Sequence, residues 1–165
     1  MSLFLTDPQI QSLLGEAKPL PANWRSRMKL KPKRGHKERE LDIQGADGSK
    51  FRIILRQADL NPLDFSVILS LLCAQTNEVF RLRRHNGKSH EHTNKIEVQT
   101  FYDFHIHQAT ERDVSAGHPE DGFAEVTDKY SDFEGALNAM IADTGFVLPS
   151  GPMPPPMPLF DGVEP

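Results

Sequence analysis

The middle of the chain constrains the fold most, because short strand-like segments alternate there with turn residues. Residues 40–43 and 79–84 alternate polar and apolar side chains, and residues 51–55 form another short apolar segment. Residues 65–72 are a continuous aliphatic and β-branched run of the length of a buried strand. Residues 40–43 and 51–55 are joined by the glycine-rich turn at residues 45–48, and strands joined by such short turns pair antiparallel. This region therefore predicts an antiparallel sheet.

Helices are predicted near both ends of this region. Thr6 is a hydroxyl N-cap followed by Asp7 and Pro8, and apolar residues at helical spacing follow up to residue 14. Residues 133–141 again show apolar side chains at helical spacing, behind Ser131 as the expected N-cap, with Glu134 three positions later.

These elements predict an α+β fold with an antiparallel sheet of about five strands, an N-terminal helix and a late helix. Residues 98–107 supply the expected fifth strand, and a partly closed barrel is the alternative arrangement. The predicted single domain covers residues 1–147. Residues 148–165 are so rich in proline that we expect a disordered, extended tail.

The net charge of −4 is unevenly distributed along the chain. Residues 25–89 hold 15 Lys or Arg and 7 Asp or Glu side chains, a net charge of +8, whereas residues 90–165 hold 3 and 14, a net charge of −11. Such a division is typical of a polyanion-binding face with an acidic remainder. It also fits two halves that attract each other, or an acidic surface for a protein partner.

Five cations alternate with other residues near the start of the positive stretch. In an extended strand they would share one face: Arg25, Arg27, Lys29, Lys31 and Lys33. They could bind the phosphates of a nucleic acid, or form a solvated edge strand on which lysines prevent pairing with other chains. Trp24 is expected as a partly buried anchor. In residues 79–84, we expect Phe80 and Leu82 on one face and Arg81 and Arg83 on the other.

Three features of the sequence predict a cytoplasmic location. No apolar run reaches the about 20 residues that cross a bilayer, so we expect no membrane association. The first eight residues lack the basic and apolar regions of a signal peptide. Cys73 is the only cysteine, which excludes an intramolecular disulfide and is typical of a reducing compartment.

Histidines gather in the second half of the chain. Five of the seven lie between residues 85 and 107, namely His85, His90, His92, His105 and His107. Residues 104–107 lie on a predicted strand, where residues two apart point to the same side about 6–7 Å apart at Cα. His105 and His107 are therefore expected to share a wet face, while Phe104 and Ile106 face the core. His90 and His92 have the same spacing on a predicted loop.

Three interpretations of this cluster remain open. The first is a divalent metal site, zinc or manganese, with ligands from His90, His92, His105, His107 and Glu111. The second needs no metal: two histidines act as acid and base on a phosphodiester. The third is ordinary hydrogen bonding. The spacing matches no standard zinc-finger or HExxH pattern, which weakens the metal interpretation.

The segments His92-Thr93-Asn94, Phe104-His105-Ile106-His107 and Gly122-Phe123-Ala124-Glu125 resemble a group of small uncharacterised prokaryotic domains. Those have an H-x-N loop, an H-[LI]-H strand and a following acidic residue on an antiparallel sheet. The chain departs from them in its proline tail and in lacking a tryptophan after the H-x-H strand. The resemblance implies that five residues lie together in space, namely His92, Asn94, His105, His107 and Glu111. It also implies a bacterial, archaeal or phage setting, in which such domains serve in toxin or defence modules.

The leading functional hypothesis is a nucleic-acid phosphodiesterase, specifically a small endoribonuclease of toxin or defence type. His105 and His107 would be its acid and base, and His92 and Asn94 would position the phosphate. Arg84 and Arg112 would stabilise charge. The alternatives are a non-enzymatic interaction protein, such as an antitoxin, immunity or anti-defence protein with a protein partner on its acidic half, and a metal-binding protein.

Overall fold

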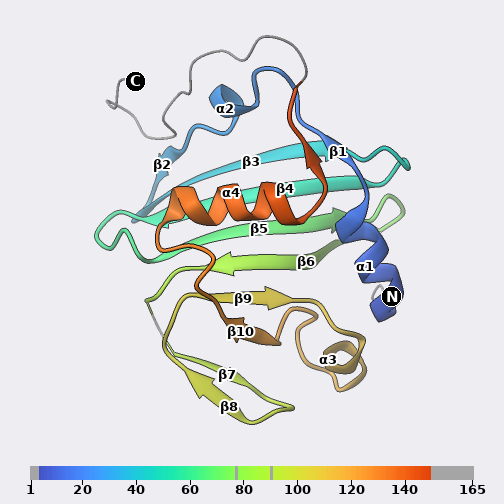
Figure 1. The fold of residues 1–165 in the computed structure, drawn as a ribbon, viewed down its shortest axis with the longest axis vertical. Helices are drawn as coiled ribbons and strands as arrows, with labels where there is room; N and C mark the ends of the chain where they lie inside the picture. Colours follow the sequence, from blue (N-terminus) through green and yellow to red (C-terminus); the bar gives the residue numbers. More distant parts are fainter. Residues whose placement is uncertain (1–3, 77, 90, 150–165) are drawn as a thin grey trace.

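The architecture is an open antiparallel sheet with helices on one face. A computed structural model describes residues 4–76, 78–89 and 91–149. The main sheet has seven strands in the order β10-β9-β6-β5-β4-β3-β2, and all its neighbours pair antiparallel (Figure 1). Its strands are β2 (Lys31–Lys33), β3 (His36–Gln44), β4 (Lys50–Ala58), β5 (Phe65–Leu72), β6 (Val79–Asn86), β9 (His105–Gln108) and β10 (Ala124–Val126).

This arrangement confirms the predicted α+β class. The five predicted strands correspond to β3, β4, β5, β6 and β9, while β2 and β10 extend the sheet at its edges. The barrel alternative is wrong, because the sheet ends at β10 and β2 and these two strands do not pair. An antiparallel sheet of this kind buries one face and leaves the other polar, which matches the alternation along β3 and β4.

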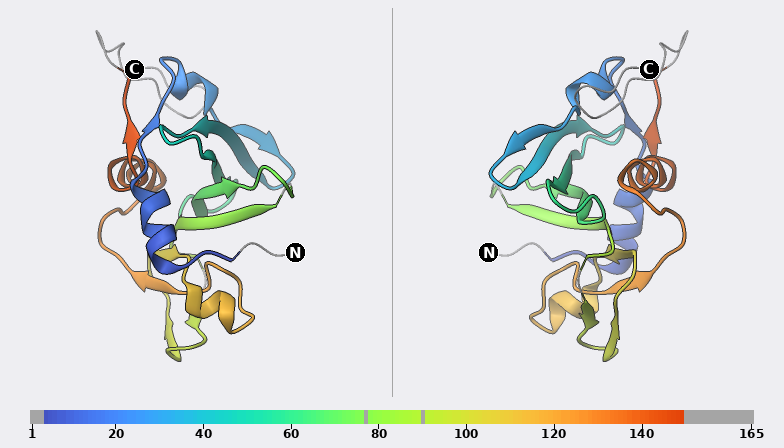
Figure 2. Two further views of the ribbon diagram at one scale, coloured as in Figure 1. Left: turned by 90° about the vertical axis from the view of Figure 1, so that its right-hand side faces the viewer. Right: turned by 90° about the vertical axis from the view of Figure 1, so that its left-hand side faces the viewer.

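Helices α1 (Asp7–Gly15) and α4 (Phe133–Asp143) lie on the same side of the sheet (Figure 2). Thr6 caps α1 as predicted, in a capping box with Gln9. The cap of α4 differs from the prediction: Asp132, and not Ser131, accepts the hydrogen bond from the Gly135 backbone N–H at 2.7 Å. An Asp carboxylate also suits the positive end of the helix dipole.

Several short elements complete the fold. They are α2 (Trp24–Arg27), α3 (Glu111–Ser115), the parallel pair β1 (Lys18–Pro19) with β11 (Phe146–Val147), and the hairpin β7 (His92–Asn94) with β8 (Gln99–Phe101). The hairpin corrects the predicted fifth strand, which is divided into β8 and β9. The hairpin turn ends at Val98, whose φ of 56° is rare for a β-branched residue. Residues 102–104 belong to no strand and separate β8 from β9.

The five alternating cations near residue 30 do not form one strand, which corrects that prediction. Arg25 and Arg27 lie in α2, and the buried Met28 and Leu30 fix the following turn against the core. Lys31–Lys33 is an edge strand, as one interpretation held, because β2 pairs only with β3. Trp24 is the expected anchor, with 6% of its surface exposed. The five cations therefore do not lie on one strand face.

A β-bulge changes the direction of the arginines on β6. The pairing of β5 with β6 shifts between Leu69 and Ser70, which inserts one extra residue on β6. Arg83 consequently turns toward α4, where its guanidinium lies 3.7 Å from the Asp143 carboxylate. Arg81 and Arg84 share the opposite, polar face. The prediction that Arg81 and Arg83 lie on one face is therefore wrong, since a simple alternation ignores the bulge.

Ion pairs join the basic and the acidic stretches of the chain. These pairs are Arg25–Glu134, Arg81–Glu120, Arg81–Asp121, Arg83–Asp143, Arg84–Asp121 and Lys88–Asp103. The attraction between the two stretches is thus a feature of the fold, and it neutralises part of the charge division. A nucleic-acid face and an acidic partner surface stay predictions.

Within residues 4–76, 78–89 and 91–149, no helix is long and apolar enough to cross a membrane. The last strand, β11, ends at Val147. The proline tail that we expect to be disordered is residues 148–165. Of these, residues 150–165 lie outside the described part of the chain. The expectation of a cytoplasmic location stays a prediction.

Candidate metal centre

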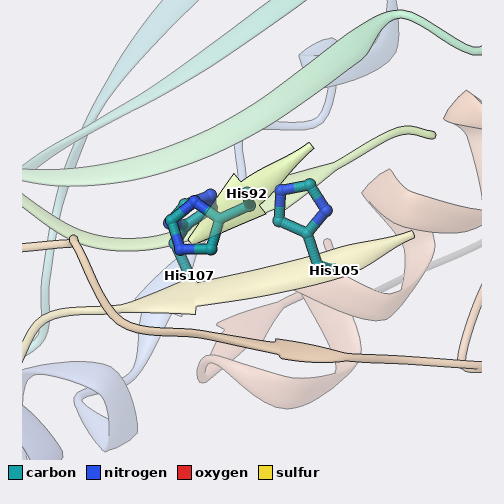
Figure 3. Close-up of side chains that lie close together, drawn as sticks. All are labelled: His92, His105 and His107. Atoms are coloured by element: carbon teal, nitrogen blue, oxygen red, sulfur yellow. The ribbon is translucent and has the colours of Figure 1, made fainter. Parts of the chain in front are cut away.

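Three histidines from two separate elements converge on the polar face of the sheet (Figure 3). His105 and His107 project from β9, and His92 reaches them from β7 of the hairpin. The ring centroid of His92 lies 4.5 Å from that of His107 and 5.5 Å from that of His105. One nitrogen from each ring lies within 4.8 Å of the other two. The predicted meeting of the H-x-H strand with the H-x-N segment is therefore seen in the structure.

Backbone carbonyls fix the orientation of two of the rings. Nδ1 of His105 lies 2.6 Å from the Asp103 carbonyl, and Nδ1 of His107 lies 2.7 Å from the Asp121 carbonyl. A carbonyl only accepts, so the proton of each neutral ring is on Nδ1 and the lone pair is on Nε2. The amide Nδ2 of Asn86 approaches Nε2 of His105 at 3.4 Å, in keeping with this assignment.

Asn94 and Gly122 fix the third ring. Nε2 of His92 lies 2.9 Å from Oδ1 of Asn94 and 2.9 Å from the Gly122 carbonyl, so this nitrogen donates and Nδ1 holds the lone pair. Asn94 is itself held by Ala124, because its Oδ1 accepts from the Ala124 N–H at 2.8 Å and its Nδ2 donates to the Ala124 carbonyl at 2.7 Å. The buried Asn94 amide thus joins the hairpin to β10.

The histidine cluster is closed on one side and borders a pocket on another. Phe101 of β8 contacts the rings of His92 and His105, with centroid distances of 5.6 Å and 5.5 Å. A pocket of about 380 Å³ is lined by His92 and His107, together with Arg84 and Asp121. A small molecule in this pocket would therefore contact the cluster directly.

Charged side chains line the pocket side of the cluster, and among them the Asp121 carboxylate is buried. The Asp121 carboxylate lies 3.3 Å from the guanidinium groups of both Arg81 and Arg84. Burial raises the pKa of Asp121 in spite of these cations. Burial, followed by the charge of Arg84, lowers the pKa of His107 to about 2. His107 is therefore a neutral imidazole at physiological pH, which is the form that binds metals.

Not every predicted site residue belongs to this centre. Glu111 bonds with Asp7 of α1, through Asp7 N to Glu111 Oε1 at 3.3 Å and Glu111 N to Asp7 Oδ1 at 3.0 Å. Arg112 has 61% of its side chain exposed and pairs with Glu97. His90 lies outside the described residues. The wet face expected for His105 and His107 is wrong, because the hairpin covers both and leaves them 0% and 3% exposed.

The structure adds two residues that the sequence reasoning missed, Asn86 and Asp121. Asn86 faces His105 across the pairing of β6 with β9, and Arg84, which was predicted as a site residue, faces His107 in the same register. Asp121 supplies both the carbonyl that orients His107 and the carboxylate beside Arg84. The sequence contains the acidic pair at residues 120–121. No local pattern, however, predicts that Asp121 contacts His107, which lies 14 residues earlier on β9.

His85 is separated from the cluster because it faces the other side of the sheet. Its Nδ1 bonds to the Ala136 carbonyl of α4 at 2.9 Å, and its Nε2 accepts from Nε of Arg83 at 3.2 Å. Burial is the main reason why the pKa of His85 falls to about 4. His85 therefore has a structural role in the core.

This pKa predicts a loss of stability in mild acid. Between pH about 6.5 and about 4 the unfolded chain protonates His85 and the folded chain does not, so the free energy of unfolding falls by up to about 1.4 kcal/mol per pH unit as the pH decreases. Urea unfolding at pH 7, 6 and 5 measures this slope. The His85→Gln variant, which cannot titrate, should show a slope smaller by that amount. Equal slopes in both proteins would contradict the prediction.

Comparisons with protein-family models, with curated proteins and with solved structures give no match for this chain. The resemblance to small prokaryotic domains therefore stays a prediction. The class of site is defined by the geometry alone: three imidazoles, oriented by carbonyl and amide oxygens, beside a polar pocket.

Proposed function

We propose that this protein binds a divalent metal ion, preferentially zinc, through His92, His105 and His107. The observation that supports this most is the orientation of the rings: each donates one N–H to a fixed oxygen, and a nitrogen of each ring lies within 4.8 Å of the others. Metal-binding histidines in proteins almost always have their second nitrogen held in this way. Three histidines with a further open position are typical of catalytic zinc sites.

Three imidazole nitrogens suit zinc chemically, and their separations are longer than those between the ligands of a bound zinc ion. Neutral imidazoles suit zinc, whereas manganese prefers carboxylate oxygens, so we favour zinc over manganese. At metal–nitrogen distances of about 2.0–2.1 Å, tetrahedral ligands lie about 3.4 Å apart. The rings must therefore approach one another by about an ångström or more from separations of up to 4.8 Å. His92, on the half-buried hairpin strand, is the ligand best placed to move.

The metal-dependent role is better supported than metal-free acid–base catalysis. An acid–base pair at neutral pH needs one imidazole that accepts a proton readily. His107 has a pKa of about 2 because it is buried beside Arg84, so it is a poor proton carrier. The same neutrality favours coordination of a cation. A metal here would polarise a water molecule or a substrate at its open position.

Zinc titration of the purified, chelator-treated chain tests the proposal. We expect one zinc ion per chain by elemental analysis, and a higher melting temperature in the presence of zinc because the ion binds only the folded state. His92→Ala should lower zinc affinity by at least about 100-fold, since it removes one of three ligands. His92 is suited to this test because it is half-buried on the hairpin, outside the main sheet.

His36→Ala is the matched control. His36 lies at the start of β3, near the opposite edge of the sheet, and its ring contacts Glu38. This variant should bind zinc like the wild type. If the wild type binds no zinc, or if His36→Ala and His92→Ala weaken binding equally, the proposed centre is refuted.

Cleavage of nucleic acid is a second candidate, favoured by the cations Arg81, Arg84 and Lys95 in the pocket wall. The basic residues of β2 lie five strand positions from β9, about 24 Å at the usual spacing, so only a long polymer would contact both regions. An assay on single-stranded RNA with the His105→Ala/His107→Ala double variant tests this candidate. Full activity of that variant would rule it out.

A further inference from the structure

We propose that the pocket beside the three histidines is a binding subsite for the phosphoryl group of a phosphate ester, held between the bound metal and Arg84. This inference rests on the metal centre proposed above and specifies the class of ligand that it receives. The pocket volume of about 380 Å³ falls in the range of small-molecule sites.

Strand register places the arginine and the metal ligands on one surface. Arg84 on β6 is the direct partner of His107 on β9, so both side chains leave the same face of the sheet. Both residues line the pocket. An anion coordinated to a metal at His107 would therefore lie beside the Arg84 guanidinium.

Arg84 has hydrogen-bonding capacity that the fold does not use. Its Nη2 lies 3.3 Å from Asp121, but its Nε is buried without a hydrogen-bond partner. An unpaired buried donor of this kind is unfavourable, and an oxygen of a bound anion would satisfy it. Arg81 differs, because its Nε already donates to Glu120 at 3.2 Å. Of the two arginines, Arg84 is therefore the one whose Nε can donate to a ligand.

Charge also favours a doubly charged oxyanion once the metal is present. The cations in the pocket wall are Arg81, Arg84 and Lys95, against the carboxylates of Asp113 and Asp121. Adding a divalent ion brings the local charge to about +3, with histidines counted as neutral. Metal ions and arginine together are the usual partners of phosphoryl oxygens. We therefore expect phosphate to bind the zinc-loaded protein and to bind the metal-free protein much more weakly.

Isothermal titration of inorganic phosphate into the zinc-loaded chain tests the subsite. We expect saturable binding that weakens at least about tenfold in Arg84→Gln, because a charge-assisted contact is lost. Arg84 is not a metal ligand in this proposal, so its variants should keep their zinc affinity. Removing one partner of a buried pair can unfold a protein, so Arg84→Gln/Asp121→Asn is the second variant. Lys95→Gln, at an exposed position, should weaken phosphate binding by a smaller factor.

Arg56→Gln is the control, because Arg56 of β4 pairs with Glu38 and does not line the pocket. It should bind phosphate like the wild type. Dimethyl phosphate and acetate, titrated in parallel, identify the ligand class. Binding of phosphate and of dimethyl phosphate, with acetate much weaker, supports a phosphate-ester subsite. Acetate binding as tightly as phosphate would overturn it in favour of a general anion site.

The outcomes separate the two proposals. If zinc binds and phosphate does not, or if Arg84→Gln binds phosphate like the wild type, the subsite is refuted and the metal centre stands. If zinc does not bind but the chain binds phosphate through Arg84, the metal centre is refuted and the anion subsite alone remains. If neither binds, both proposals are refuted.

Discussion

Replacing Asn94 with alanine is expected to lower the free energy of unfolding by about 3 kcal/mol and to weaken zinc binding by about 10- to 100-fold. The Asn94 amide substitutes for a neighbouring strand beside β10, bonding both the N–H and the carbonyl of Ala124. Without it, two buried backbone groups lose their partners, at about 1–3 kcal/mol each. His92 also loses an acceptor that fixes its ring.

Urea unfolding and zinc titration of the same preparations measure both effects. Asn138→Ala is the control, because Asn138 lies on the exposed side of α4, where alanine is a better helix former. That variant should be as stable as the wild type or slightly more stable. A loss of less than about 1 kcal/mol in Asn94→Ala would mean that water replaces the amide between the hairpin and β10.

Replacing Lys18 with methionine should cost at least about 3 kcal/mol of the free energy of unfolding. The side chain of Lys18 is 0% exposed, and its Nζ lies 2.6–3.1 Å from four carbonyl oxygens that share its three protons, those of Leu13, Leu14, Glu16 and Thr144. These carbonyls include those of Leu13 and Leu14 in the last turn of α1, where Leu13 also accepts from the Glu16 N–H at 3.4 Å. Burial lowers the pKa of Lys18 to about 8, so the amine is still mainly charged at pH 7.

Methionine has nearly the shape of lysine but no donor, so the variant isolates the hydrogen bonds. The loss of the charge-assisted bonds made by the three ammonium protons exceeds the desolvation cost that is relieved, about 1.4 kcal/mol for each pKa unit. Lys50→Met, at an exposed position of β4, is the control and should change stability by less than about 0.5 kcal/mol. Thermal or urea unfolding of both variants measures this difference. Equal unfolding midpoints for the two variants would contradict the prediction.

The local pattern of the chain was enough for much of the sheet and both long helices. The alternation over residues 40–43 and the apolar segment at residues 51–55 predicted two strands on either side of a turn, and the structure has β3 and β4 there. The Thr6 cap was predicted correctly because it depends on residues within one helical turn. The single-residue error at the α4 cap has the same origin, since Ser131 and Asp132 are both good caps and only packing selects one.

The pairing of histidines with spacing of two was also predictable, because alternate residues of a strand point to the same side. That rule places His105 with His107 and His92 with Asn94. The rule does not predict that the strand of His92 and Asn94 covers His105 and His107. The burial of these residues follows from the hairpin turn, which lays β7 over β9, and from the Asn94 bonds to β10.

The composition of the centre was decided by the tertiary structure. The bulge on β6 turns Arg84 and Asn86 toward the histidines, and Glu111 lies on α3 bonded to α1. The carbonyls that orient His92 and His107 come from Gly122 and Asp121, in a loop that no periodicity marks. Strand periods and caps depend on neighbours within a few residues, so the sequence encodes them directly. The convergence of side chains depends on register between distant segments, which only the folded chain defines.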